Sequence, residues 1–331
     1  MPNYSVLDLV PVVAGQSLAE AYQVAVTLAQ HVEKLGYERL WVAEHHSMPG
    51  IASAATAVVM GHLAAATTTL RIGSGGIMLP NHPPLVIAEQ FGTLEAMYPG
   101  RIELGLGRAP GSDPQTSRAL RKDPTRQGQD FPQLLQELQD YLAPEQILPG
   151  QVRAIPGEGQ HIPIWLLGSS DFSARLAGQL GLPFGFAAHF SPQNTMPALH
   201  IYRQSFVPSA VLSEPYALVC VNVFAADTTA YAAYIATSAQ QQFLSLIRGN
   251  PGKLPKPVHN MDDLWTQREK EGVLSQLAGT FIGDSATIQA KLNSYATLTQ
   301  ADEIMVISSA YDLQDRLRTY EIVAEQMNIQ A

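Results

Sequence analysis

The chain has 331 residues, of which 46% are hydrophobic and only 15% are charged, and its formal net charge is −9. The apolar content excludes a disordered chain, and the negative balance argues against a nucleic-acid binder. A single cysteine, Cys220, excludes an intrachain disulfide and a cysteine-clustered metal site. The low charge indicates either apolar surface hidden at a subunit interface or in a dry cavity, or an exterior rich in uncharged polar residues.

Short β-rich apolar runs alternate with longer helical patterns along the chain. Eight strands are predicted to begin near Tyr4, Glu38, Leu70, Arg101, Ile162, Pro183, Tyr216 and Glu303. Helical periodicity predicts helices over Leu18–Leu35, Ser53–Ala66, Pro84–Met97, Phe131–Leu142, Asp171–Leu180 and Thr228–Ile247. Gly36 is well placed to end the first helix.

This alternation predicts a parallel sheet with helices on its faces. Eight strand–helix units favour a single α/β domain over residues 1–331, a (β/α)8 TIM barrel. A doubly wound open sheet is the alternative, but no G-x-G-x-x-G follows the first strand. Two insertions stretch the pattern. After strand 4 come the polar segments 110–129 and 144–159, and after strand 7 a mobile loop is expected within residues 249–272.

The part of this loop over Gly249–Asn260 is expected to act as a lid, with Gly249 and Gly252 as hinges. No run of apolar residues is long enough for a membrane span, and residues 1–10 lack the basic start of a signal peptide. We therefore expect a cytoplasmic protein without membrane or nucleic-acid partners.

Active sites of such barrels lie at the carboxyl ends of the strands. Those ends carry Asp8, Glu44-His45-His46, Ser74-Gly75-Gly76, Gly107-Arg108, Gly168-Ser169-Ser170, His189, Asn222 and Ser308-Ser309. Adjacent side chains of an extended segment point to opposite faces, so only one of His45 and His46 should face the barrel mouth. The spacings that bring two histidines onto one metal are absent. A catalytic or orienting histidine is favoured over a metal ligand, with a structural hydrogen-bonding role as the alternative.

Two further patterns indicate a cofactor. Three glycines in the run 73–76 are typical either of a β-bulge or of a backbone approached closely by a flat ligand. At 168–173 a strand, a Gly-Ser-Ser turn and a helix start follow one another, an arrangement that binds phosphate through backbone N–H groups, and Arg108 can add the charge. Simple N-capping by Ser169 or Ser170 is the alternative. Together the patterns favour FMN over a sugar phosphate.

The sequence also resembles the bacterial luciferase-like flavin monooxygenases over nearly its whole length. The resemblance is carried by GYERLWVAEHH, by LRIGSGGIMLPNHPPLVIAEQFGTLEAMYPGRIELGLGRAPG and by IPIWLLGSSDFSARLAGQLGLP. It implies a dimeric barrel that takes reduced FMN from a separate NAD(P)H-dependent flavin reductase. The family then activates O2 as a flavin C4a-hydroperoxide and oxidises a small, largely apolar organic substrate.

Matched position by position, the resemblance implies a catalytic role for His45 and a cis peptide under the flavin at Gly75-Gly76. It also implies cofactor contacts by Arg108, Ser170 and Ser173, to which the strand–turn–helix pattern adds Gly168 and Ser169. Gly107 stands where luciferases have cysteine, and Ser169 where they have glutamate, so the resemblance does not extend to light emission. Three other interpretations stay open: a deazaflavin (F420)-dependent dehydrogenase with the same barrel, a flavin-binding protein without catalysis, and a metal-dependent hydrolase built on Asp8, His45, His46 and His189.

Overall fold

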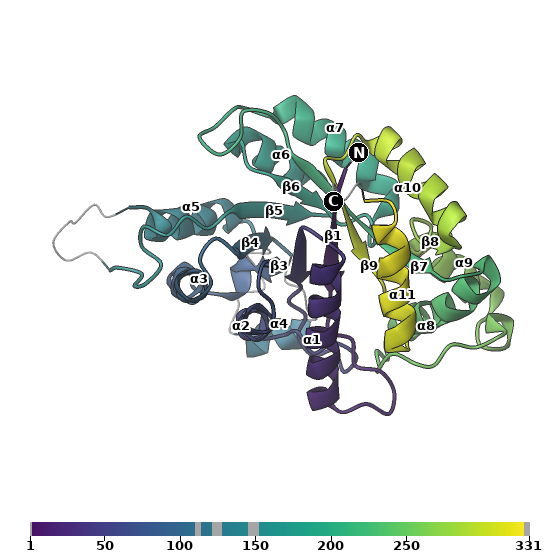
Figure 1. Ribbon diagram of the computed structural model, residues 1–331. Coiled ribbons are helices and arrows are strands. Elements are labelled where there is room, and N and C mark those ends of the chain that lie inside the picture. Colours follow the sequence, from purple (N-terminus) through teal and green to yellow (C-terminus); the bar gives the residue numbers. More distant parts are fainter. Residues whose placement is uncertain (1, 110–113, 121–127, 145–151, 328–331) are drawn as a thin grey trace.

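The computed structural model describes residues 2–109, 114–120, 128–144 and 152–327. Its strands are β1 (Asn3–Asp8), β2 (Arg39–Val42), β3 (Arg71–Met78), β4 (Ile102–Gly107), β5 (Ile164–Gly168), β6 (Phe184–Phe186), β7 (Ala217–Ala225), β8 (Phe281–Gly283) and β9 (Glu303–Ile307). Eight of them close a parallel barrel, because β1 to β7 pair in chain order and β9 pairs with both β7 and β1. The predicted (β/α)8 barrel is confirmed (Figure 1).

The helices surround this barrel. They are α1 (Leu18–Lys34), α2 (Thr56–Ala66), α3 (Pro84–Met97), α4 (Pro114–Ala119), α5 (Phe131–Leu142), α6 (Asp171–Leu180), α7 (Thr195–Ser205), α8 (Thr229–Ile247), α9 (Gln267–Gln276), α10 (Ser285–Thr299) and α11 (Leu313–Ala324). Among the described residues, no helix is both long enough and apolar enough to cross a bilayer.

The bounds of α3, α5 and α6 are those predicted, while three other helices differ at an end. α1 ends at Lys34, and Gly36 follows in the left-handed region with φ +81°. α2 begins at Thr56 rather than Ser53, where the Ser53 hydroxyl donates to the Ala43 carbonyl and holds the segment against the end of β2. α8 begins at Thr229, because Thr228 is its N-cap and accepts a hydrogen bond from the Tyr231 N–H.

The two insertions contain more regular structure than predicted. After β4, the described part of 110–129 includes α4, while residues 110–113 and 121–127 lie outside the described residues. Residues 145–151 of the second polar segment, 144–159, also lie outside the described residues. After β7, the predicted loop 249–272 contains a 3-10 turn at Met261–Asp263 and the start of α9, so its irregular part ends at Thr266.

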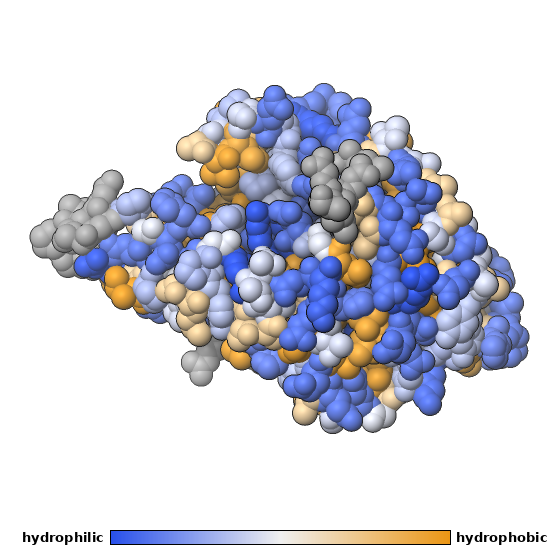
Figure 2. Space-filling view, viewed as in Figure 1, coloured by the Kyte–Doolittle hydropathy of each residue, from blue (hydrophilic) through white to orange (hydrophobic). Residues whose placement is uncertain are grey.

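Apolar side chains fill both the barrel and the layer between strands and helices. Inside the barrel lie Leu7, Trp41, Ala43, Trp165, Leu218, Cys220, Met305 and Ile307. The barrel is therefore packed and not a pore, which leaves its two ends for polar groups. On the face seen in Figure 2, hydrophilic residues predominate and apolar residues form scattered patches.

Candidate active site

The two histidines after β2 have different surroundings, as predicted for adjacent side chains of an extended segment. The His46 Nε2 atom lies 2.8 Å from the Glu44 carboxylate. The His45 ring instead lies edge-on to Phe190, with a centroid distance of 6.4 Å. Burial lowers the pKa of His45, although the Glu44 carboxylate acts in the opposite direction. His45 is therefore a neutral imidazole at pH 7, which can both accept and donate a hydrogen bond.

A second neutral imidazole lies beside it. His189, after β6, is only 8% exposed, and its ring packs on Phe190 at 4.4 Å. Burial and, to a smaller extent, the neighbouring His45 lower the pKa of His189 to about 4, although the hydrogen bond that its ring donates to the Cys220 backbone carbonyl acts in the opposite direction. Its Nδ1 atom has no hydrogen-bond partner within the described part of the chain. Sequence reasoning had placed His189 only among strand ends and metal candidates.

The glycines of β3 are explained first by packing. A Cβ at Gly73 would overlap the Trp41 ring, and one at Gly76 would lie 2.7 Å from the Leu167 side chain. The strand register also shifts between Gly75 and Ile77, which is the bulge of the alternative interpretation. Packing and the bulge therefore account for these glycines by themselves, and contact with a flat ligand stays a prediction. The Gly75–Gly76 peptide is cis, as the family resemblance implied.

The predicted anion site is brought together from β4, β5 and α6. The Arg108 guanidinium lies over the Phe172 ring at 4.3 Å, in the first turn of α6. Ser170 is the N-cap, yet its side chain makes no capping hydrogen bond. A Cβ at Gly168 would lie 2.7 Å from the Ser173 Cβ, so glycine is required there. Simple N-capping therefore does not explain these serines, and the helix N-terminus keeps backbone donors for an anion beside Arg108.

The buried Glu44 carboxylate binds several groups around the barrel mouth. Its carboxylate accepts hydrogen bonds from the Met78 N–H and the Asn81 amide, both at 2.9 Å, and lies 2.9 Å from His82 Nε2. These contacts keep the pKa of Glu44 below its usual value despite burial, which acts the other way. Glu44 is therefore ionised at neutral pH and binds the backbone beyond the cis peptide.

Other polar strand ends have structural partners. The Asp8 carboxylate is paired with the buried Arg316 guanidinium at 2.8 Å. The Ser74 hydroxyl donates to the Gly105 carbonyl at 2.8 Å. Within the described chain, no group of three or more His, Cys, Asp or Glu side chains has the arrangement of a metal site.

Comparison with known proteins identifies the family. The model of the luciferase-like monooxygenase family matches residues 4–301. This chain belongs to that family. A luciferase-like monooxygenase of Escherichia coli (strain K12) is 52% identical over 97% of this chain and 96% of its own.

Solved structures agree with this assignment. The crystal structure of apo-MsnO8 has a TM-score of 0.86 and 33% identity, with 98% of both chains covered. Two more distant structures share the fold alone. The FMN complex of the oxygenating constituent of 3,6-diketocamphane monooxygenase from Pseudomonas putida has a TM-score of 0.75 at 16% identity, covering 100% of this chain and 99% of that one. An F420-dependent secondary alcohol dehydrogenase has a TM-score of 0.69 at 13% identity, covering 99% and 100%.

The predicted lid, residues 249–260, is hydrogen-bonded to a loop at the mouth of the barrel. Leu254 is fully buried, and its backbone exchanges hydrogen bonds with Val12 and Ala14 in the loop after β1. Gly50, which follows the histidines, packs so closely on the Gly252 carbonyl that a Cβ would overlap it. Residues 249–260 thus lie against the segments that follow β1 and β2. Their motion as a lid stays a prediction.

Proposed function

We propose that this protein is an FMN-dependent monooxygenase that uses reduced FMN and O2 to oxidise a small, largely apolar organic molecule. The observation that carries the proposal is the meeting of Arg108 with the uncapped N-terminus of α6 at the barrel mouth. This arrangement supports a bound phosphate, because a guanidinium and free backbone N–H groups are both anion donors.

The donor set fits the phosphate of FMN. Arg108 and the backbone N–H groups of Ser169 and Ser170 would bind it, and the small Gly168 and Ser173 leave the turn compact. The Gly75–Gly76 segment would support the flavin ring from β3. When bound, the reduced flavin supplies the electrons that activate O2, while the protein orients the flavin and excludes water.

His45 would hold a proton near the reacting part of the flavin. A neutral imidazole suits this role, because it accepts or donates a proton near neutral pH. The buried His189 and the Phe190 ring lie beside His45 and would reduce its contact with water. Exclusion of water by these side chains would limit side reactions at the cofactor.

The proposal includes two partners. A separate NAD(P)H-dependent flavin reductase would deliver reduced FMN. A second copy of this chain would cover α2 and α3, which pack side by side. α2 contains no Asp, Glu, Lys or Arg, yet its Val58 is 74% exposed, and Met97 at the end of α3 is 59% exposed. An uncharged apolar helix surface of this kind is typical of a subunit interface.

Anaerobic titration with reduced FMN, followed by rapid mixing with O2, tests the proposal. The monooxygenase should bind the flavin and form a transient flavin–oxygen adduct visible in absorbance. Rapid oxidation without an adduct, at the rate of free reduced FMN, would contradict oxygenase function. Tight binding of oxidised FMN without substrate-stimulated turnover would indicate a carrier protein instead.

A deazaflavin-dependent dehydrogenase is the second candidate, favoured by the shared fold with the F420-dependent alcohol dehydrogenase. Parallel titration with F420 distinguishes the two. Preferential binding of F420, and reduction of that cofactor by an alcohol without O2 consumption, would replace the monooxygenase proposal.

A further inference from the structure

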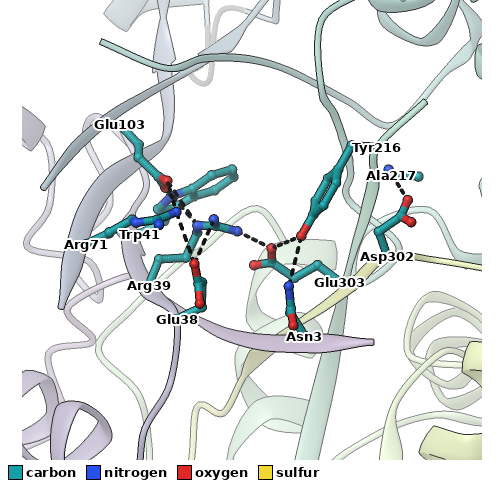
Figure 3. Close-up of polar contacts among 10 residues, drawn as sticks. All are labelled: Asn3, Glu38, Arg39, Trp41, Arg71, Glu103, Tyr216, Ala217, Asp302 and Glu303. Carbon is teal, nitrogen blue, oxygen red and sulfur yellow. Dashed lines mark hydrogen bonds and ion pairs between the residues drawn. The ribbon is translucent and has the colours of Figure 1, made fainter. Parts of the chain in front are cut away.

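Trp41, inside the barrel, connects Glu103 near the start of β4 to the Gly75–Gly76 segment of β3. Trp41 of β2, Gly73 of β3 and Glu103 of β4 are register partners and form one row across three strands. The Trp41 indole N–H donates a hydrogen bond to the Glu103 carboxylate at 2.8 Å (Figure 3). The indole therefore crosses β3, which is possible because Gly73 has no Cβ at that point.

The same side chain contacts the next inward position of β3. A Cβ on Gly75 would lie 3.0 Å from Trp41 Cβ and 3.3 Å from its ring atom Cε3. Trp41 is 1% exposed and packs edge-on against Trp165 at 5.1 Å. Because the indole is buried and packed against Trp165, it limits, together with Leu7, where the backbone at Gly75 can lie.

Glu103 and Glu303 make a natural pair for comparison at the barrel base. Arg39 lies between them, 2.9 Å from the Glu103 carboxylate and also bonded to Glu303 (Figure 3). Both carboxylates are buried. Glu103 holds Trp41, whereas Glu303 accepts a hydrogen bond from the Tyr216 hydroxyl at 3.0 Å. The two acids thus share one guanidinium but hold different aromatic side chains.

We propose that Trp41, held by Glu103, is a positioning residue that fixes the Gly75–Gly76 backbone for the flavin ring. The part concerning flavin rests on the proposed function. The side chain acts through β3 and makes no cofactor contact itself. The backbone beyond the cis peptide reports on this positioning, because the Glu44 N–H donates to the Gly76 carbonyl at 3.2 Å and the Met78 N–H to the Glu44 carboxylate.

Three variants test the proposal: Trp41→Phe, Glu103→Gln and, as the matched control, Glu303→Gln. A glutamine at 103 replaces one carboxylate oxygen by an NH2 donor and loses the charge that pairs with Arg39, so it holds the N–H groups of Arg39 and Trp41 less firmly than the carboxylate does. Two properties are measured for each variant. One is hydrogen exchange at the amides of Glu44 and Met78 in the cofactor-free protein. The other is the Kd for FMN together with the absorption spectrum of the bound flavin.

Trp41→Phe and Glu103→Gln should speed exchange at both amides and raise the Kd for FMN by about tenfold each, with a shifted flavin spectrum. Glu303→Gln should lower Tm to a similar degree, yet leave exchange and Kd within about twofold of the wild type. Equal effects of the two glutamine variants, or unchanged exchange in both Trp41→Phe and Glu103→Gln, would overturn the proposal.

Two safeguards keep the outcome decisive. If Trp41→Phe does not fold, the comparison of Glu103→Gln with Glu303→Gln decides by itself. If the wild type does not bind FMN, the proposed function fails, while the exchange rates still decide whether Trp41 positions β3.

Discussion

The Glu44 carboxylate accepts a hydrogen bond from the backbone N–H of Met78 at 2.9 Å. Glu44 also donates its own N–H to the Gly76 carbonyl at 3.2 Å. One residue just after β2 thus binds β3 at two points, at Gly76 within the bulge and at Met78 beyond it. Glu44 thereby joins the candidate flavin platform at Gly75–Gly76 to His45, the proposed catalytic histidine, which follows it directly in the chain.

Glu44→Gln should weaken both stability and cofactor binding. A neutral amide has one acceptor where the carboxylate serves Met78, Asn81 and the two histidines, so the free energy of unfolding should fall by about 2 kcal/mol. Urea unfolding and FMN titration measure the two effects. Glu33→Gln is the matched control, because the Glu33 carboxylate likewise accepts several hydrogen bonds, from the backbone N–H groups of Thr68, Thr69 and Leu70 before β3 begins. Comparable loss of FMN affinity in the control would contradict the role of Glu44.

Arg108→Ala should reduce affinity for FMN much more than for riboflavin, which lacks the phosphate. A charge-assisted hydrogen bond contributes about 1.5–3 kcal/mol, so the Kd for FMN should rise by about 10- to 100-fold. Fluorescence titration with both flavins gives the ratio directly. An unchanged ratio would remove Arg108 from the phosphate site.

Local signals predicted much of the barrel. Helix α6, for example, follows from Ser170 before an apolar-periodic run and Gly181 after it, with Gly181 at φ +61°. All eight barrel strands were located, because each is a short apolar run between polar segments. β8 was missed because its three residues stand between Thr280 and Asp284, whereas the equally short β6 lies in the longer apolar run PFGFAA. Helices α7, α10 and α11 were missed because polar residues interrupt their apolar stripes.

The sequence alone did not show which residues far apart in the chain pack against one another. Nothing local to residues 73–76 shows that Trp41 lies over them, so the glycines looked like a ligand surface. Similarly, the partner of Asp8 is Arg316, at the other end of the chain. His189 was named from the sequence as a polar strand end and as a metal candidate, but a single histidine in FAAHF forms no motif that would place its ring beside His45.

His189 should make the protein less stable in acid. Its pKa is about 4 in the folded protein against 6.5 when unfolded, so the unfolded chain binds the proton more readily and stability falls as the pH drops from 6.5 towards 4. The contribution amounts to about 2 kcal/mol between pH 7.5 and pH 5. Urea unfolding across this range should show a shallower loss for His189→Gln than for the wild type. His161→Gln, at an exposed histidine, should follow the wild-type profile, and identical profiles for all three proteins would refute this role.

Val58→Glu should convert the proposed homodimer into a monomer. The charge would be placed on the uncharged face of α2, where a second copy would have to bury it without a partner. Light scattering after size-exclusion chromatography measures the mass. Leu298→Glu on α10, at a side chain that is 60% exposed, is the control and should stay dimeric. A wild type that is monomeric at micromolar concentration would contradict the dimer directly.

The most direct test of the account is the oxidation of the reduced FMN complex of the wild type and of His45→Ala by O2, followed by absorbance after rapid mixing. The account predicts a transient flavin–oxygen adduct in the wild type and an adduct that decays about tenfold faster or more in His45→Ala, since a positioned acid–base group contributes at least this much. Equal affinity of the two proteins for reduced FMN would show that the substitution changes the reaction with O2 and not flavin binding. Identical decay in both proteins, or oxidation in the wild type at the rate of free reduced FMN, would contradict it.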